Sequence, residues 1–83
     1  MLNILYFAHL RETLGLDNET VDIPDTATVD GLVNELRARG GVWADALSAG
    51  KRWRVAVNQD MAAAATPLKS GDEVAIFPPV TGG

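Results

Sequence analysis

The sequence predicts an α+β fold, in which a mixed β-sheet carries one main helix and a short second helix on one face. Three observations lead to this fold class. Apolar runs rich in strand-forming residues stand near both ends of the chain, and a segment with helical spacing lies between them. The length of 83 residues suffices for one domain, and an apolar content of 47% argues against disorder.

The first strand is predicted over residues 2–8, which form a near-continuous apolar run. Such a run is typical of a central strand that is buried on both faces. Asn3 interrupts the run and indicates that the odd positions face outward. The side chains that then face the core are Leu2, Ile4 and Tyr6.

A short helical turn or wide loop is predicted over residues 9–15, because a glycine stops it. Residues 19–23 alternate between polar and apolar side chains. We therefore expect a second strand there, antiparallel to the first, with Val21 and Ile23 facing inward. Pro24 ends this strand.

The main helix has the clearest sequence signals. Thr28 is a suitable N-cap, and Asp30 in the first turn complements the helix dipole. Gly40-Gly41 mark the end of the helix, and a second short helix is expected over 42–49. The apolar residues that recur at helical spacing are Val29, Leu32, Val33 and Leu36.

Three more strands are predicted after the helices. Residues 53–59 form the third strand, 61–64 a short edge strand after a turn, and 73–76 the last strand. The side chains expected to face inward are Val55, Val57, Val74 and Ile76. This order of elements, ββαβ(β)β, is that of the β-grasp or ubiquitin-like architecture.

Side chains alternate between the two faces along each predicted strand, and this places a set of apolar residues on the sheet face away from the helix. Its members are Leu5, Phe7, Ala56, Ala75 and Phe77, with Met61 nearby. One small helical layer does not cover that face, and an exposed apolar patch usually marks a partner surface. The alternative is that side loops fold over the face, or that the strand phases are off by one residue.

The domain is predicted to end at residue 77 and to continue as an extended tail. The tail consists of Pro78, Pro79, Val80, Thr81, Gly82 and Gly83. Its two prolines cannot extend a central ladder and hold the chain extended, so that the tail could reach roughly 20 Å from the fold. Two glycines leave a narrow tip with an unobstructed carboxylate. The alternative is an ordinary disordered chain end.

Composition excludes several classes of function. The net charge of −4 argues against nucleic acid or an anionic membrane as the main partner. The absence of cysteine excludes disulfides, thiolate catalysis and cysteine-based metal sites, and it fits a reducing cytoplasm. No apolar run approaches the roughly 20 residues of a membrane span, and the start of the chain lacks a signal-peptide pattern.

No combination of residue types at a recognisable spacing in the sequence predicts an active site or a metal site. His9 has no nucleophile or second ligand at a recognisable spacing, so we interpret it as a surface residue. Asp72-Glu73 suit a turn, and Trp43 and Trp53 suit packing. The reactive group that remains is the C-terminal carboxylate of Gly83. It is ionised at pH 7 and is a poor electrophile, so it must be activated by another protein.

Three stretches of the sequence carry a resemblance to a known family. They are Phe7-Ala8-His9-Leu10-Arg11-Glu12, Val57-Asn58-Gln59 and Gly71-Asp72-Glu73-Val74-Ala75-Ile76-Phe77-Pro78-Pro79-Val80-Thr81-Gly82-Gly83. The chain resembles the MoaD family, the ubiquitin-like sulfur carriers that form the small subunits of molybdopterin synthase. Length and element order match end to end, and the last stretch is the most specific.

The resemblance implies a function in molybdenum cofactor biosynthesis. An E1-like, MoeB-like enzyme would use ATP to adenylate Gly83, and a sulfur donor would convert the adenylate to a thiocarboxylate. The tail would then enter the large, MoaE-like subunit, where sulfur passes to cyclic pyranopterin monophosphate and forms the molybdopterin dithiolene. By similarity, two small and two large subunits form a heterotetramer.

The same resemblance implies what this chain contributes to the reaction. It would be the sulfur-carrying co-substrate of a sulfurtransferase whose active site lies mainly on the large subunit, and it would bind no cofactor or metal itself. The family docks on its partners at positions that correspond to Phe7, Arg11, Met61 and Phe77.

Two other functions stay open on the sequence alone. In the first, a protein of the same fold acts in a different pathway, as a ThiS-like carrier for thiazole synthesis or an archaeal or Urm-type modifier of lysines. The other is a ubiquitin-like binding module with an inert tail.

Overall fold

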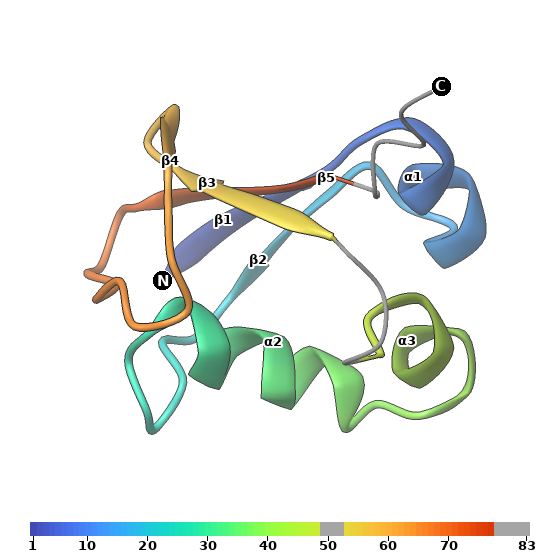
Figure 1. The fold of residues 1–83 in the computed structure, drawn as a ribbon, viewed down its shortest axis with the longest axis horizontal. Helices are drawn as coiled ribbons and strands as arrows, with labels where there is room; N and C mark the ends of the chain where they lie inside the picture. The colour runs from blue at the N-terminus through green and yellow to red at the C-terminus, as the bar shows by residue number, and fades with distance from the viewer. Residues whose placement is uncertain (49–52, 78–83) are drawn as a thin grey trace.

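The computed structural model describes residues 1–48 and 53–77, except the side chain of His9. The predicted tail, 78–83, and the expected surface position of His9 lie outside the described residues. The elements are β1 (Leu2–Tyr6), α1 (Ala8–Leu14), β2 (Asn18–Val21), α2 (Val29–Arg37), α3 (Gly41–Ala46), β3 (Arg54–Val57), β4 (Asp60–Met61) and β5 (Glu73–Phe77) (Figure 1).

The five strands form one mixed sheet in the order β2-β1-β5-β3-β4. The first and last strands, β1 and β5, are parallel neighbours at its centre, with Tyr6 opposite Ile76. The remaining pairs are antiparallel, and for β1 with β2 this confirms the expectation. The sheet thus confirms the predicted β-grasp topology.

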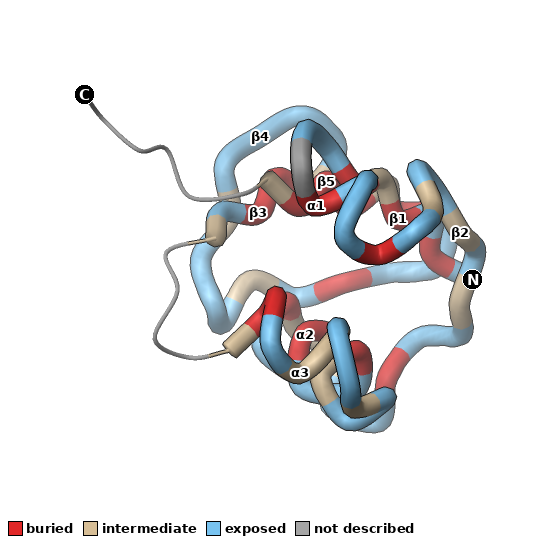
Figure 2. The backbone as a smooth tube through the Cα atoms, turned by 90° about the vertical axis from the view of Figure 1, so that its right-hand side faces the viewer, coloured by how far each residue is buried: buried red, intermediate tan, exposed pale blue. Residues whose placement is uncertain are grey.

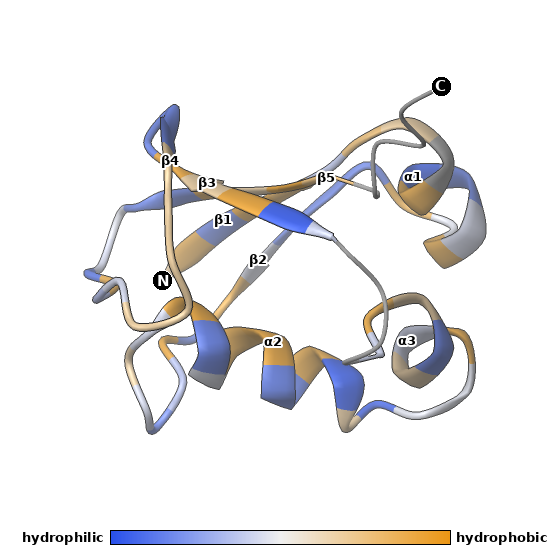
Figure 3. Ribbon diagram, viewed as in Figure 1, coloured by the Kyte–Doolittle hydropathy of each residue, from blue (hydrophilic) through white to orange (hydrophobic). Residues whose placement is uncertain are grey.

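Helices α2 and α3 cover one face of the sheet, and α1 lies beside the end of β1 (Figure 1). Buried residues gather between the sheet and these helices (Figure 2), and the apolar side of α2 faces the sheet (Figure 3). The core side chains that confirm the predicted strand and helix phases are Leu2, Ile4, Tyr6, Val29, Leu32, Val33, Leu36, Val55, Val74 and Ile76. Val21 and Val57 are half-buried against this core.

The start of α2 is fixed by its cap and by a glycine. The Thr28 hydroxyl accepts a hydrogen bond from the Gly31 backbone N–H at 3.1 Å, as the sequence predicts. A Cβ atom at Gly31 would collide with the Thr26 carbonyl oxygen, so that this close approach of loop and helix requires glycine.

The edge strand β4 is shorter than the predicted 61–64. The Ala62 N–H still donates to the Val55 carbonyl of β3 at 3.0 Å, and beyond it the chain leaves the sheet and turns toward the start of α2. There the Val29 N–H donates to the Thr66 carbonyl at 3.0 Å and the Asp30 N–H to the Ala64 carbonyl at 2.9 Å. The first N–H groups of a helix have no partner inside the helix, so this loop supplies their acceptors instead of continuing the strand.

Three side chains differ from the prediction. Strand β2 ends at Val21, two residues before Ile23, and Ile23 is 37% exposed while Pro24 is buried. On the outer face of the sheet, Ala56 and Ala75 are buried rather than exposed. They lie opposite each other across β3 and β5, and a methyl side chain extends little above a sheet.

Candidate functional site

The strand register places four apolar residues in one row across the outer face. Leu5 lies opposite Ala75, Ala75 opposite Ala56, and Ala56 opposite Met61. The row runs over β1, β5, β3 and β4. Its two ends differ, because Leu5 is half-buried whereas Met61 is 61% exposed.

An aromatic pair extends this row at the end of the sheet. The rings of Phe7 and Phe77 stack with 4.8 Å between centroids and 11° between planes. The Phe7 N–H donates to the Ile76 carbonyl at 3.3 Å, which fixes Phe7 beside β5. We call the six residues of row and pair the docking surface: Leu5, Phe7, Ala56, Met61, Ala75 and Phe77.

The opposite half of the outer face is polar. Asn3 lies opposite Glu73, and the Thr20 hydroxyl donates to the Asn3 amide oxygen at 3.3 Å. The Glu73 backbone N–H donates to the Asn58 amide oxygen at 3.0 Å. The docking surface therefore occupies only the half of the outer face toward which β5 runs, next to the point where the tail begins.

Asp72 stabilises the turn before β5. Its carboxylate accepts hydrogen bonds from the Asn58 amide at 2.9 Å and from the Lys69 backbone N–H at 2.8 Å. These two bonds lower the pKa of Asp72 below its usual value. The expectation that Asp72 is a turn residue is confirmed, because the bond from Lys69 closes the 69–72 turn and the bond from Asn58 holds this turn against the β3-β4 hairpin.

The structure gives a place to each predicted partner-binding residue. Phe7 and Phe77 stack on each other, and Met61 lies on the same face of the sheet. Arg11 is exposed on α1, the helix that starts directly after Phe7. It borders a hollow of about 370 Å³ with Glu12, Gly15, Leu16 and Asp17. Gly83 and the tail lie outside the described residues.

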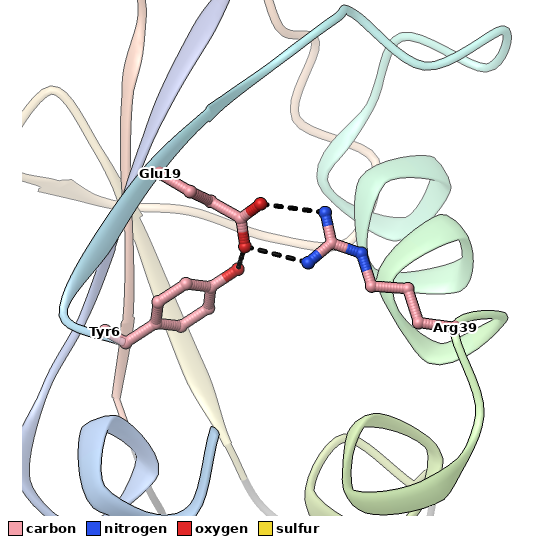
Figure 4. A network of polar contacts seen from close by, with 3 residues as sticks. All are labelled: Tyr6, Glu19 and Arg39. Carbon is pink, nitrogen blue, oxygen red and sulfur yellow. Dashed lines mark hydrogen bonds and ion pairs between the residues drawn. The ribbon is translucent and has the colours of Figure 1, made fainter. Parts of the chain in front are cut away.

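A polar network on the helix side of the sheet has no counterpart in the sequence-based expectations (Figure 4). The Tyr6 hydroxyl donates to the Glu19 carboxylate at 2.7 Å. The Arg39 guanidinium donates to both oxygens of the same carboxylate, at 2.8 and 2.9 Å. The network therefore joins β1 and β2 to the chain just after α2.

Trp43 completes this network from α3. Its ring contacts Tyr6 edge-on, with 5.5 Å between centroids, and the Arg39 guanidinium lies 4.4 Å above it. Trp53 likewise packs on the core and donates to the Ser48 carbonyl at 3.4 Å. The packing role predicted for both tryptophans is confirmed.

Protonation of the network follows from burial and hydrogen bonding. Burial raises the pKa of the Tyr6 phenol, and the neighbouring Glu19 carboxylate raises it further. Burial opposes ionisation of Glu19, but hydrogen bonds from Arg39 and Tyr6 and the charge of Arg39 outweigh it and lower the Glu19 pKa. Glu19 is thus ionised and Tyr6 neutral at pH 7, a state suited to holding elements together rather than to proton transfer.

The described residues offer neither a metal site nor a membrane-spanning helix. Within 1–48 and 53–77, no three acidic or histidine side chains are grouped so that they could hold a metal ion. None of the helices in the described residues has the length and apolarity that a membrane crossing requires.

Comparison with known proteins gives the family. A family model described as the ThiS family matches residues 4–83. The molybdopterin synthase sulfur carrier subunit of Haemophilus influenzae is 45% identical over 83 residues, and the match covers all of both chains.

Two solved structures have the same fold. The small archaeal modifier protein 1 of Haloferax volcanii is 30% identical with a TM-score of 0.71, and the match covers 95% of this chain and 97% of that one. A chain in the complex of subunits 1 and 2 of the molybdopterin-converting factor from Helicobacter pylori is 23% identical with a TM-score of 0.67, over 99% and 97% of the two chains.

The full-length identity to a curated relative agrees with the β-grasp fold and with the sequence motifs quoted above. The chain therefore belongs to the ThiS family and, within it, to the molybdopterin synthase sulfur carrier subunits.

Proposed function

We propose that the C-terminal carboxylate of Gly83 is the group that carries sulfur. In the first step a carboxylate oxygen attacks the α-phosphorus of ATP on an E1-like enzyme, and pyrophosphate leaves. In the second step sulfur from a donor, at the oxidation level of sulfide, attacks the acyl carbon, and AMP leaves. The product is a thiocarboxylate at Gly83, and this chain binds neither the ATP nor a metal ion.

Membership of the sulfur carrier family is the observation that carries this proposal. The composition supports it, because a chain without cysteine has no side-chain thiol on which a transferable sulfur could be held. The two glycines support it as well, since a tip without side chains can enter a narrow active site.

The acceptor we propose is cyclic pyranopterin monophosphate, held by the large subunit of molybdopterin synthase. The thiocarboxylate sulfur attacks a carbon of the acceptor and displaces an oxygen substituent from it. Water then cleaves the acyl–sulfur bond, which leaves the sulfur on the acceptor and returns the Gly83 carboxylate. Two carriers supply the two sulfurs of the dithiolene, in a cytoplasmic assembly of two small and two large subunits.

The docking surface is the part of the fold that we assign to these partners. An exposed apolar patch next to the start of the tail lets a partner hold the domain while it receives the tip. Arg11, exposed beside Phe7, adds a charge at the rim of the patch. The chain in the Helicobacter pylori complex has the same fold, and that complex joins two subunits.

The intact mass of the chain tests the carrier chemistry. After incubation with the activating enzyme of the same organism, ATP and sulfide, we expect a gain equal to the difference between a sulfur and an oxygen atom. The variant that lacks Gly83 should show no gain, although its thermal unfolding should match that of the intact chain. An unchanged mass with an enzyme that releases pyrophosphate in the presence of the chain would refute the thiocarboxylate.

A second candidate function is attachment of the same C-terminus to lysine side chains. The likeness to the small archaeal modifier protein 1 of Haloferax volcanii favours it, because a modifier uses an activated C-terminus in a similar way. The lysine amine would attack the acyl adenylate and release AMP. Peptides that carry a Gly-Gly remnant on lysine in extracts of the source cells would support this function, and their loss on deletion of Gly83 would tie them to this chain.

A further inference from the structure

The edge of the sheet formed by β2 is open. In the strand order β2 is outermost, with β1 as its neighbour on one side. The Tyr6 N–H donates to the Asp17 carbonyl at 2.9 Å, and in an antiparallel pair hydrogen-bonded positions alternate. Glu19 and Val21 therefore also bond to β1, whereas the backbone N–H and C=O groups of Asn18 and Thr20 point away from the sheet. An edge of this kind can receive another strand.

A groove runs along this edge on the helix side. It has a volume of about 230 Å³ and is lined by Val21, Asp22, Leu32, Glu35, Leu36 and Arg39. Its floor is apolar and its rim is charged. Ile23, whose side chain the sequence placed in the core, is 37% exposed next to the groove. Side chains on the inner face of an added strand would enter this groove.

Charge selects the kind of strand that fits. A second hollow of about 340 Å³ shares Glu35 with the groove and is bordered by Asp25 and Asp30. Together with Asp22, these residues place four carboxylates along the path of an added strand. The single cation in the linings of the two hollows, Arg39, is already bound by Glu19.

A second copy of this chain fits the edge poorly. Pairing of β2 with its own copy would bring the acidic flanks of both strands, Asp17 and Asp22, into one short interface. The chains that approach each other would also both carry a net charge of −4. Like charges held close together destabilise such a contact.

We propose that the β2 edge and the adjoining groove bind an extended segment of a partner protein, as a sixth strand of the sheet. One face of this segment carries apolar and basic side chains in alternation. The apolar groups contact Val21 and Ile23, and the basic groups contact Asp22 and Glu35. The groove lies on the helix side of the sheet and the docking surface on its outer face, so this site is distinct from the docking surface and does not rest on the proposed function.

A designed peptide tests the site directly. The probe has about nine residues, with isoleucine and lysine alternating on one face and threonine on the other. At about 1 mM peptide, a concentration that half-saturates even a millimolar site, we expect NMR shifts at the amides of Asn18 and Thr20 and their protection from hydrogen exchange. Absence of both effects overturns the proposal, as does concentration-dependent pairing of β2 with a second copy in the absence of peptide.

Two control peptides separate strand addition from simple charge attraction. A peptide with methyl groups on the backbone nitrogens that face β2 cannot donate to the edge and should not bind. A peptide with glutamate in place of lysine should also fail to bind. Equal binding of the methylated and the unmethylated peptide would contradict strand addition.

Charge-reversal variants locate the site on the protein. Asp22→Lys and Glu35→Lys should each weaken peptide binding about fivefold, the size expected of an exposed charge pair. The matched variants Glu12→Lys and Asp60→Lys change exposed acids on other elements and should bind within about twofold of the original chain. Equal losses in both sets would show attraction to the overall charge and would refute a site at β2.

Discussion

The two faces of the sheet are built from alternate residues of the same strands, yet they differ in what they do. On β1, Ile4 is fully buried under α2 whereas its neighbour Leu5 is half-buried on the outer face. On β5, Ile76 is fully buried whereas Phe77 stacks on the exposed Phe7. Inner residues hold the domain together, and we propose that outer ones meet partners, so substitutions should separate stability from binding.

The largest expected effect is on the inner face. Ile4→Ala removes fully buried carbon atoms from a packed core and should lower the free energy of unfolding by about 2–5 kcal/mol. Leu5→Ala on the outer face is the matched control and should cost about half as much, because part of that side chain is already in contact with water. Urea denaturation measures both, and equal losses would mean that the outer face is as tightly packed as the core.

The next effect concerns binding rather than stability. Phe7→Ala removes an exposed ring from the docking surface and should weaken binding to the large synthase subunit by about 10- to 100-fold, as for a central aromatic contact. Loss of its stacking on Phe77 should cost only about 1 kcal/mol of stability. Titration calorimetry with the large subunit provides the measurement. Asn3→Ala, on the polar half of the same face, should leave the affinity unchanged, and an equal loss there would contradict the assignment.

A smaller effect depends on pH. The pKa of Glu19 lies below its ordinary value of 4.5, so its interactions with Arg39 and Tyr6 stabilise the fold above about pH 4.5 and are lost as the pH falls through the lowered pKa. Glu19→Gln should therefore cost about 1 kcal/mol at pH 6 and less at pH 3. Thermal unfolding at the two pH values, with Glu12→Gln as the exposed control, would show the difference. A cost that does not change with pH would mean that packing, not charge, holds this carboxylate.

The smallest effect is a gain at the β3-β4 hairpin. Asn58 and Gln59 both have positive φ, at 50° and 73°, as a two-residue hairpin turn requires. Gln59→Gly removes the steric cost of the left-handed conformation and should raise the free energy of unfolding by about 0.5 kcal/mol. Gln59→Ala keeps a Cβ atom and should bring no gain in the same urea titration.

The sequence predicted local structure better than contacts between distant segments. The spacing of apolar residues was sufficient to predict which strand side chains face inward and which side of α2 is buried. Strands repeat every two residues and helices every 3.6, and both repeats are visible in the sequence. The spacing failed at Ile23, where the repeat continues in the sequence although the backbone has already left the strand. Alternation gave the correct face for Ala56 and Ala75 but not their burial, which depends on the size of their neighbours.

The polar network shows a different limit. Tyr6, Glu19 and Arg39 come from three segments, and 20 residues separate Glu19 from Arg39. No local pattern marks such a set, because each member taken alone resembles an ordinary core or surface residue. The acidic side chains of the groove beside β2 and of the adjoining hollow were missed for the same reason, since they come from the loop between β2 and α2 and from α2 itself.

The central position of β1 and β5 has a consequence for synthesis of the protein. The first strand made and the last strand made are direct neighbours, and the Gly71 N–H donates to the carbonyl of Met1 at 2.8 Å. A growing chain therefore cannot complete its sheet until β5 has left the ribosome. A chain that stops before β5 therefore lacks the centre of the sheet. The aromatic pair of the docking surface joins Phe7 to Phe77, so this surface forms only after residue 77 has been synthesised.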